Sequence, residues 1–190
     1  AAAAALSRGG VCKTCPQGRA PPHRIFDNGA MKIVILDRDG TINALGGEEF
    51  IASPEDWHAL PGALEAIARL NRAGWHAVVA SNQPGLGRGL FDVATLNAIH
   101  AAMHKQLAAS GGRIDAVFYC PHAPSEECAC RKPAPGLLEQ ICDRYGVDAK
   151  DVHVVGACQV HLQAGAALGA RLHLVCTGVS AHLAPGLPLP

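Results

Sequence analysis

Two aspartates stand two residues apart, directly after a short apolar run, in the segment Asp37-Arg38-Asp39-Gly40. An extended backbone points alternate side chains to one side, so the two carboxylates would face the same space. One carboxylate of such a pair can attack phosphorus, while the other gives a proton to the leaving oxygen and later takes one from water. The alternative is a polar strand-to-loop turn of the Asp-Gly type.

Two further segments offer groups that bind phosphate oxygens. Ser81-Asn82 precedes a glycine-rich turn, where a hydroxyl and free backbone N–H groups can hold an anion. Arg131-Lys132 supplies two adjacent cations, and a lysine charge can offset that of a phosphoryl group and position a carboxylate nucleophile. In isolation, the first segment would be an ordinary loop and the second a solvated basic pair.

One imidazole and three potential thiolates gather in a single segment, at Cys120, His122, Cys128 and Cys130. Four such ligands close a tetrahedral site and leave no position for water, which predicts a structural zinc ion. The ion would order a long loop and present the adjacent basic pair to the phosphate pocket. The alternative is free or disulfide-bonded cysteine, which this density of soft ligands in an intracellular chain disfavours.

The other cysteines give weaker signals. Cys142, Cys158 and Cys176 lie in apolar surroundings and are predicted to be small core residues. Cys12 and Cys15 form a C-x-x-C pair that could in principle bind zinc or cycle its redox state. No second pair follows at finger spacing and no strand precedes it, so we expect no function there.

Short apolar runs alternate with helical patterns and must position these groups. Runs apolar on both faces predict buried parallel strands at residues 33–36, 77–80, 114–119, 152–155 and 172–175. Apolar residues at helical spacing predict three helices: one with Leu64, Ile67 and Leu70, one with Leu96, Ile99, Met103 and Leu107, and one with Leu138, Ile141, Cys142 and Tyr145. The second of these begins behind an N-cap at Asp92. A fourth, short helix is predicted at residues 160–168. This alternation predicts a three-layer Rossmann-like α/β fold with a mainly parallel central sheet, whose ligands lie at the carboxyl ends of the strands.

Composition narrows the class of protein. The chain has 190 residues, enough for one domain, and its 16 basic residues equal its 16 acidic ones, so no basic field tracks a nucleic acid. No apolar run is long enough for a membrane span or a signal peptide, which predicts a cytoplasmic protein. We expect a disordered leader at 1–30, a domain at 31–178, an irregular and truncated tail at 179–190, and a monomer that binds a small molecule.

The segment 37–43, Asp-Arg-Asp-Gly-Thr-Ile-Asn, resembles the first motif of the haloacid dehalogenase superfamily. The segment beginning at Ser81 resembles its second motif, and Lys132 resembles its third-motif lysine. The resemblance implies that Asp37 is the nucleophile and Asp39 the general acid/base, with Ser81 and Lys132 holding the phosphoryl group. It also implies a magnesium ion held by Asp37 and the main-chain carbonyl of Asp39.

Together with the Cys/His segment, these motifs are similar over roughly 31–178 to the D-glycero-D-manno-heptose 1,7-bisphosphate 7-phosphatase family. That family removes the 7-phosphate of a heptose bisphosphate, on the route to a lipopolysaccharide precursor, with magnesium and a structural zinc. The resemblance implies substrate contacts from Arg38, Asn82, Arg88 and Arg131. Histidinol-phosphate phosphatases share the zinc segment; Gly87-Arg88-Gly89 and the absence of a second biosynthetic domain favour the heptose branch.

One segment departs from the family pattern. Where the family has Gly-Asp and a further Asp four positions on, this chain has Gly156-Ala157 and His161, while Gln163-Ala164-Gly165 keeps the register. Ala157 removes an oxygen ligand and should weaken magnesium binding. We expect a solvated His161 rather than a ligand to a softer ion. Two hypotheses follow: an active or weakened sugar-phosphate phosphatase, or an inactive relative that only binds a phosphorylated ligand.

Overall fold

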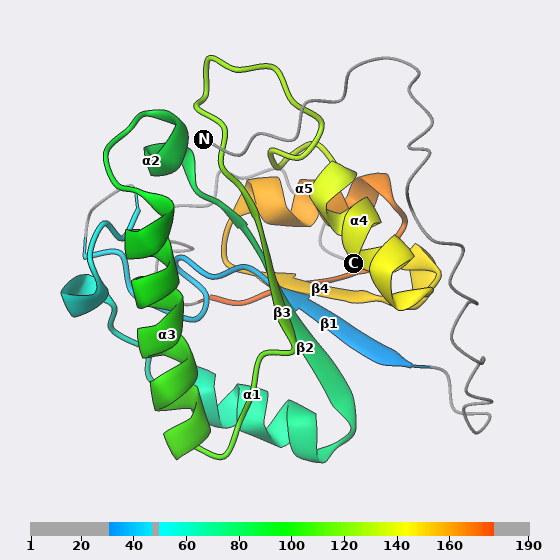
Figure 1. The fold of residues 1–190 in the computed structure, drawn as a ribbon. Helices are drawn as coiled ribbons and strands as arrows, with labels where there is room; N and C mark the ends of the chain where they lie inside the picture. Colours follow the sequence, from blue (N-terminus) through cyan, green and yellow to red (C-terminus); the bar gives the residue numbers. More distant parts are fainter. Residues whose placement is uncertain (1–30, 47–49, 177–190) are drawn as a thin grey trace, which may run out of the picture. The chain divides into compact units, whose positions relative to one another are not determined.

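The computed structural model describes residues 31–46 and 50–176, which form a five-stranded sheet between two layers of helices (Figure 1). The strands are β1 (Lys32–Leu36), β2 (Trp75–Asn82), β3 (Ala116–Cys120), β4 (His153–Gly156) and β5 (Arg171–Leu174). The α-helices are α1 (Ala63–Arg72), α2 (Pro84–Gly87), α3 (Val93–Ala109), α4 (Gly136–Tyr145) and α5 (Gln159–Ala167). Two short 3-10 helices, η1 (Pro54–Asp56) and η2 (Ala149–Asp151), complete the elements.

All strand pairs are parallel, in the order β3-β2-β1-β4-β5. β1 is therefore central, with Leu36 paired to Val79 of β2 on one side and to Val155 of β4 on the other. Residues that follow β1, β2 and β4 consequently meet at one edge of the sheet. The predicted parallel α/β fold is confirmed.

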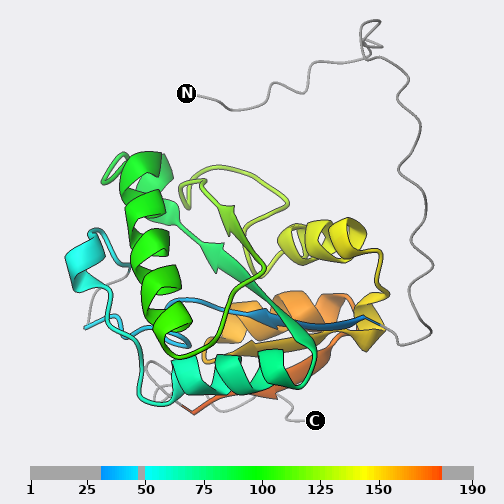
Figure 2. The same cartoon turned by 60° about the horizontal axis from the view of Figure 1, so that its bottom comes forward.

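Two apolar cores separate the layers. Helices α1 and α3 cover one face of the sheet, and α4 and α5 cover the other (Figure 2). The first core joins Val34 and Val79 to residues of α1 and α3, while the second joins Ile35 and Val78 to residues of α4 and α5. Alternate residues of each strand point to opposite faces of the sheet, and helices cover both faces. This explains why each strand is apolar throughout.

The five predicted strands and four predicted helices agree with the structure apart from their ends. Asp92 caps α3 as expected, its carboxylate accepting from the Thr95 N–H at 2.7 Å. β3 begins two residues later than predicted, because Asp115 instead accepts from the Ala77 N–H at 3.0 Å. The glycine-rich segment after Ser81, expected to be a turn, contains the short helix α2.

The two tryptophans of the chain differ in environment. Trp57 is buried in the first core, and its indole N–H has no hydrogen-bond partner within the described residues. Trp75 begins β2, is partly buried, and meets the edge of the His153 ring at 4.7 Å between centroids.

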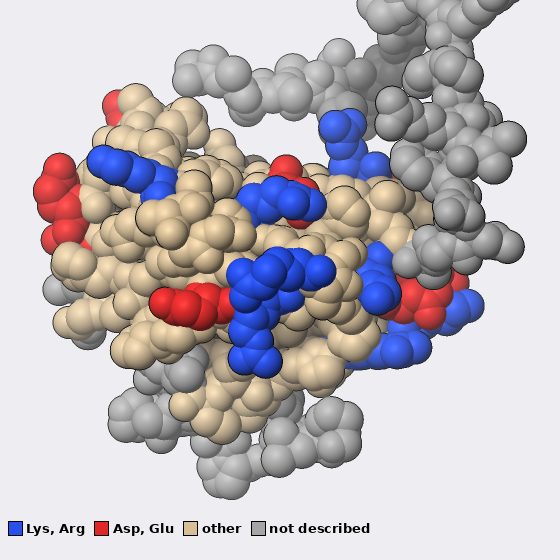
Figure 3. Space-filling model, turned by 90° about the horizontal axis from the view of Figure 1, so that it is seen from below, with Lys and Arg blue, Asp and Glu red and all other residues tan. Residues whose placement is uncertain are grey.

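No helix among the described residues is long and apolar enough to cross a membrane. On the face seen in Figure 3, basic and acidic side chains lie among larger areas of uncharged residues, without a continuous basic field. The leader at 1–30, the Cys12/Cys15 pair and the tail at 179–190 lie outside the described residues. The domain boundaries and the monomeric state stay predictions.

Candidate active site

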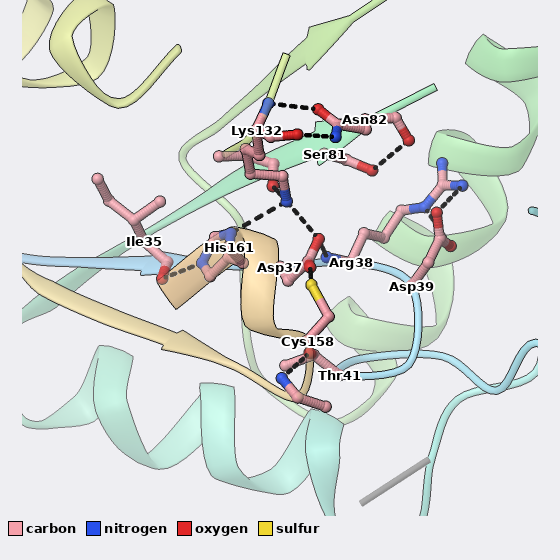
Figure 4. A network of polar contacts seen from close by, with 12 residues as sticks. Ile35, Asp37, Arg38, Asp39, Thr41, Ser81, Asn82, Lys132, Cys158 and His161 are labelled. Carbon is pink, nitrogen blue, oxygen red and sulfur yellow. Dashed lines mark hydrogen bonds and ion pairs between the residues drawn. The ribbon is translucent and has the colours of Figure 1, made fainter. Parts of the chain in front are cut away.

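Side chains from three adjacent strand ends and one loop converge at the carboxyl edge of the sheet (Figure 4). Asp37 follows β1, Ser81 is the penultimate residue of β2, and Cys158 lies two residues beyond β4. Lys132 comes from the loop between β3 and α4. The sheet order brings these four residues together although they are distant in sequence.

An open cavity of about 330 Å³ occupies this edge. Its lining residues are Asp37, Asp39, Leu45, Ser81, Asn82, Pro84, Pro124, Arg131, Lys132, Cys158 and Val160. A second cavity, of about 600 Å³, shares Leu45 with the first and is lined by Arg88, His58 and Asp56 among others. A phosphate-sized group fits the first cavity, and the second offers room beside it for the rest of a ligand.

Asp37 and Lys132 form a buried ion pair, with Lys132 Nζ 2.8 Å from Asp37 Oδ1. Asp37 Oδ1 also accepts from the Arg38 N–H at 2.9 Å. Burial opposes the charge of Asp37, but the Lys132 ammonium, together with hydrogen bonds from Cys158 and Lys132, outweighs burial and lowers the Asp37 pKa to about 2. The carboxylate is therefore ionised and fixed in place.

Lys132 uses all three of its donors inside the protein. Besides Asp37 it contacts the Ala80 carbonyl at 2.7 Å and His161 Nδ1 at 3.0 Å. The expectation of a solvated His161 is wrong, since this side chain is fully buried. Desolvation and the neighbouring Lys132 charge lower the His161 pKa to about 4, so the ring is neutral and accepts from the ammonium.

Asn82 fixes the backbone that carries Lys132. Its amide accepts from the Lys132 N–H at 3.1 Å and donates to the Lys132 carbonyl at 3.0 Å. Asn82 also lines the first cavity. Both of its polar groups are thus engaged by the loop, which gives it a positioning role, while the substrate contact expected of it stays a prediction.

Arg38 does not reach the cavity as expected for a substrate-binding residue. It is completely buried, and its guanidinium donates to both carboxylate oxygens of Asp39 at 3.0 Å and to Gln83 Oε1 at 3.2 Å. His100 Nε2 lies 3.2 Å from Arg38 Nη1. A bidentate pair of this kind fixes the plane of the Asp39 carboxylate. These contacts place Arg38 where it can support Asp39, while the substrate contact expected of it stays a prediction.

Gln83 completes this support and was not identified from the sequence. It is fully buried, and its Nε2 donates to Asp39 Oδ2 at 3.0 Å and to Ser81 Oγ at 2.7 Å. Gln83 therefore joins the second carboxylate to the hydroxyl predicted to bind phosphate. Only its position next to Ser81-Asn82 hinted at this role.

The segment after β4 carries the departure from the family pattern. Ala157 is buried, and its N–H donates to Thr41 Oγ1 at 2.9 Å. Its side chain is a methyl group, which offers no oxygen ligand to a cation. Cys158 was expected in the core, but it lines the cavity, with Sγ 2.8 Å from Asp37 Oδ2. Burial and the Asp37 charge raise the Cys158 pKa to about 12, so its thiol is neutral. Cys176, also expected in the core, is exposed, and Cys142 is half-buried against the second core.

The four predicted zinc ligands lie together, with their ligand atoms all within 4.8 Å of one another. Cys130 Sγ is 3.3 Å from both Cys120 Sγ and His122 Nδ1, and Cys120 Sγ is 3.7 Å from Cys128 Sγ. Ligands about 2.0–2.3 Å from a central ion in tetrahedral geometry are separated by similar distances. The cluster could hold a metal ion.

Comparison with known proteins identifies the family. A model of the haloacid dehalogenase-like hydrolases matches residues 35–169. The chain belongs to this hydrolase family. A relative in Bordetella bronchiseptica, D-glycero-beta-D-manno-heptose-1,7-bisphosphate 7-phosphatase, is 55% identical over 148 residues, which span 78% of this chain and 82% of the relative. The enzyme of the same name in Pseudomonas aeruginosa is 44% identical over 158 residues, 83% of this chain and 88% of that one.

Solved structures of haloacid dehalogenase-like hydrolases share the fold. The D,D-heptose 1,7-bisphosphate phosphatase from B. bronchiseptica, complexed with magnesium and phosphate, gives a TM-score of 0.75 at 53% identity, covering 80% of this chain and 84% of that one. The corresponding protein from Burkholderia thailandensis gives 0.60 at 51% identity, covering 79% and 81%. The resemblance to this family is therefore confirmed, whereas the roles of individual site residues stay predictions.

Proposed function

We propose that the protein is a sugar-phosphate phosphatase that removes the 7-phosphate of D-glycero-D-manno-heptose 1,7-bisphosphate. The ion pair between Asp37 and Lys132, in a cavity that also contains Asp39 and Ser81, carries this proposal. The names of relatives at 44–55% identity support the choice of substrate. The second cavity, with Arg88, would receive the remainder of the sugar.

The chemistry divides between the two aspartates. An Asp37 carboxylate oxygen attacks phosphorus, and the bond from phosphorus to the sugar oxygen breaks. Asp39 enters this step in its protonated form and gives that oxygen its proton. Water then attacks the aspartyl-phosphate while Asp39 takes a proton from it, which releases inorganic phosphate and restores Asp37. Arg38 and Gln83 hold Asp39 in orientation throughout.

The surrounding cations and hydroxyl stabilise the transferring group. Lys132 keeps Asp37 ionised and offsets the developing negative charge. Ser81 Oγ lies at the cavity wall, where it would donate to a phosphate oxygen. Arg131 lines the same wall and donates to the His122 carbonyl, which fixes it to the Cys/His loop.

We also assign a magnesium ion and a zinc ion. Asp37 and the Asp39 main-chain carbonyl are the oxygen donors left for magnesium, and Ala157 adds none, so the site is weakened but compatible with a cation shared with phosphate. When bound, magnesium would neutralise phosphate charge. Zinc would be held by Cys120, His122, Cys128 and Cys130 and would order the loop. The cytoplasmic location stays a prediction.

Phosphate release from a substrate panel tests the proposal. Heptose 1,7-bisphosphate should turn over faster than histidinol phosphate, and Asp37→Asn should abolish the reaction while the protein stays folded. A wild-type rate no higher than that of Asp37→Asn, at saturating magnesium, would identify an inactive relative. A preference for histidinol phosphate would move the chain to that branch.

A further inference from the structure

The charges around the first cavity favour an anion. Among the described residues, its lining carries two carboxylates, Asp37 and Asp39, and two cations, Arg131 and Lys132. Arg38, behind the wall, pairs with Asp39 at 3.0 Å and neutralises it. The Asp37 charge is likewise offset by Lys132 at 2.8 Å. Two positive side chains thus face two negative ones in the cavity lining, and Arg38 adds a third positive charge behind it.

The groups that surround Asp37 and Lys132 after β4 add no negative charge. The position after β4 is the methyl group of Ala157, and the third partner of Lys132 is the neutral ring of His161. The Cys158 thiol donates to Asp37 without carrying a charge of its own. Among the described residues, Lys132 is therefore paired with a single carboxylate, that of Asp37.

A divalent cation alone meets a poor site here. Asp37 supplies the one carboxylate not already paired bidentately with an arginine, and its Oδ2 already accepts from Cys158. Hard cations such as magnesium are bound through one or two carboxylates together with phosphate oxygens and waters. Phosphate oxygens would therefore supply the ligands that Ala157 cannot.

We propose an order of binding: the phosphate group enters this cavity first, without a divalent cation, and the cation binds only to the complex so formed. This inference rests on the proposed function, because it places the phosphate of the substrate in the first cavity. Ser81 and Arg131 supply hydrogen-bond donors to the anion, while Lys132, whose donors are all engaged, acts through its charge.

The test compares inorganic phosphate and magnesium as separate ligands of the full chain. Loosely bound metal is removed by gel filtration, without a chelator, so that the Cys/His cluster is left intact. Phosphate binding is followed by phosphorus NMR and magnesium binding by titration calorimetry. The wild type should bind phosphate without magnesium, should show no heat with magnesium alone, and should bind magnesium once phosphate is present.

Restoring a carboxylate should reverse the order. Ala157→Asp should bind magnesium by itself, and its phosphate affinity without magnesium should fall by about tenfold or more, because a like charge is added near the anion. Ala157→Asn adds an oxygen without charge and should leave phosphate binding unchanged. Ala101→Asp, at an exposed position of α3, controls for net charge and should behave as wild type.

The outcomes separate this inference from the proposed function. Phosphate binding that requires magnesium, or equal magnesium affinity in wild type and Ala157→Asp, overturns the binding order and leaves the phosphatase assignment standing. Absence of phosphate binding under every condition overturns both. Phosphate binding without magnesium that Lys132→Met abolishes supports the order and locates the anion at this cavity.

Discussion

Ala157 is a single side chain whose replacement by a carboxylate would change the charge of this site. It follows β4 at the same edge as Asp37, where a carboxylate would face Asp37, the proposed nucleophile, and the proposed magnesium ion. Without that carboxylate, Asp37 and the main-chain carbonyl of Asp39 are the oxygen ligands that we propose for magnesium. The effect of the missing carboxylate on magnesium binding can be measured, because the substitution Ala157→Asp restores it.

Ala157→Asp should increase heptose bisphosphate turnover at limiting magnesium on the order of tenfold to a hundredfold, because the added ligand stabilises the cation that offsets charge in the transition state. The magnesium concentration for half-maximal rate should fall in parallel. Steady-state phosphate release over a magnesium series measures both. An unchanged, already high rate would show that another group replaces the missing ligand.

Arg38→Met tests whether this arginine supports Asp39 or binds substrate. Loss of the guanidinium removes the charged partner of Asp39 and the donor to Gln83 Oε1, so kcat should fall with little change in KM. The free energy of unfolding should decrease by about 2–4 kcal/mol. Arg131→Met, which changes a residue of the cavity wall, should mainly raise KM. Steady-state kinetics and urea unfolding distinguish the two; a KM effect alone from Arg38→Met contradicts the supporting role.

The loop between β3 and α4 joins the Cys/His cluster to the carboxyl edge of the sheet, where Asp37 lies. The cluster ends at Cys130, and Arg131 and Lys132 follow immediately. Helix α2 packs against the same loop so closely that a Cβ at Gly87 would lie 2.8 Å from the Pro121 carbonyl oxygen. Ordering of the loop between β3 and α4 should therefore fix the position of Lys132, which lies two residues after Cys130.

Cys128→Ser should remove bound zinc and reduce turnover, because the loop loses the ligand set that holds Lys132 in position. The thermal midpoint should fall by roughly 5–10 °C. Metal analysis, calorimetry and phosphate release follow the three effects. Cys142→Ser, on α4 and outside the cluster, is the matched control and should keep both metal and activity. Full activity in a zinc-free Cys128→Ser protein would separate the cluster from catalysis.

Two buried neutral histidines make the free energy of unfolding of the domain depend on pH. His161 and His100 both have a pKa lowered to about 4, by desolvation first and then by the charges of Lys132 and Arg38 respectively. The unfolded chain protonates such residues near pH 6.5, so it binds more protons than the folded protein between pH 6.5 and about 4. The stability contributed by neutral burial is complete above that window and is lost as the pH falls through it.

From pH 7 to pH 5, His161 alone should reduce the free energy of unfolding by about 2 kcal/mol, and His100 acts in the same direction. His161→Asn can still accept from Lys132 but does not titrate, so it should lose correspondingly less stability over this range. Urea unfolding of both proteins at the two pH values gives the difference. Equal losses in wild type and variant would mean that His161 is already protonated in the folded state.

The elements, the strand-end aspartates and the Cys/His cluster could be predicted because their signals are local. Apolar runs, the Asp92 cap and clustered ligands all lie within a few residues of one another. The contacts that the sequence did not predict join partners far apart along the chain: Arg38 and His100 are separated by 62 residues, Lys132 and His161 by 29, and Asp37 and Cys158 by 121. Only the sheet order β3-β2-β1-β4-β5 brings these pairs together, and no local pattern specifies which side chains then meet.

The contrast between the two tryptophans gives the protein an internal optical signal. Trp57 belongs to the same core as Ile51, which lines the second cavity, and the buried indole of Trp57 should emit at short wavelength. Trp75 borders His153, whose protonation would quench it. A ligand in the second cavity should thus alter the short-wavelength emission of Trp57, while acidification should alter the longer-wavelength emission of Trp75. Ligand binding can therefore be followed by tryptophan fluorescence in unlabelled protein.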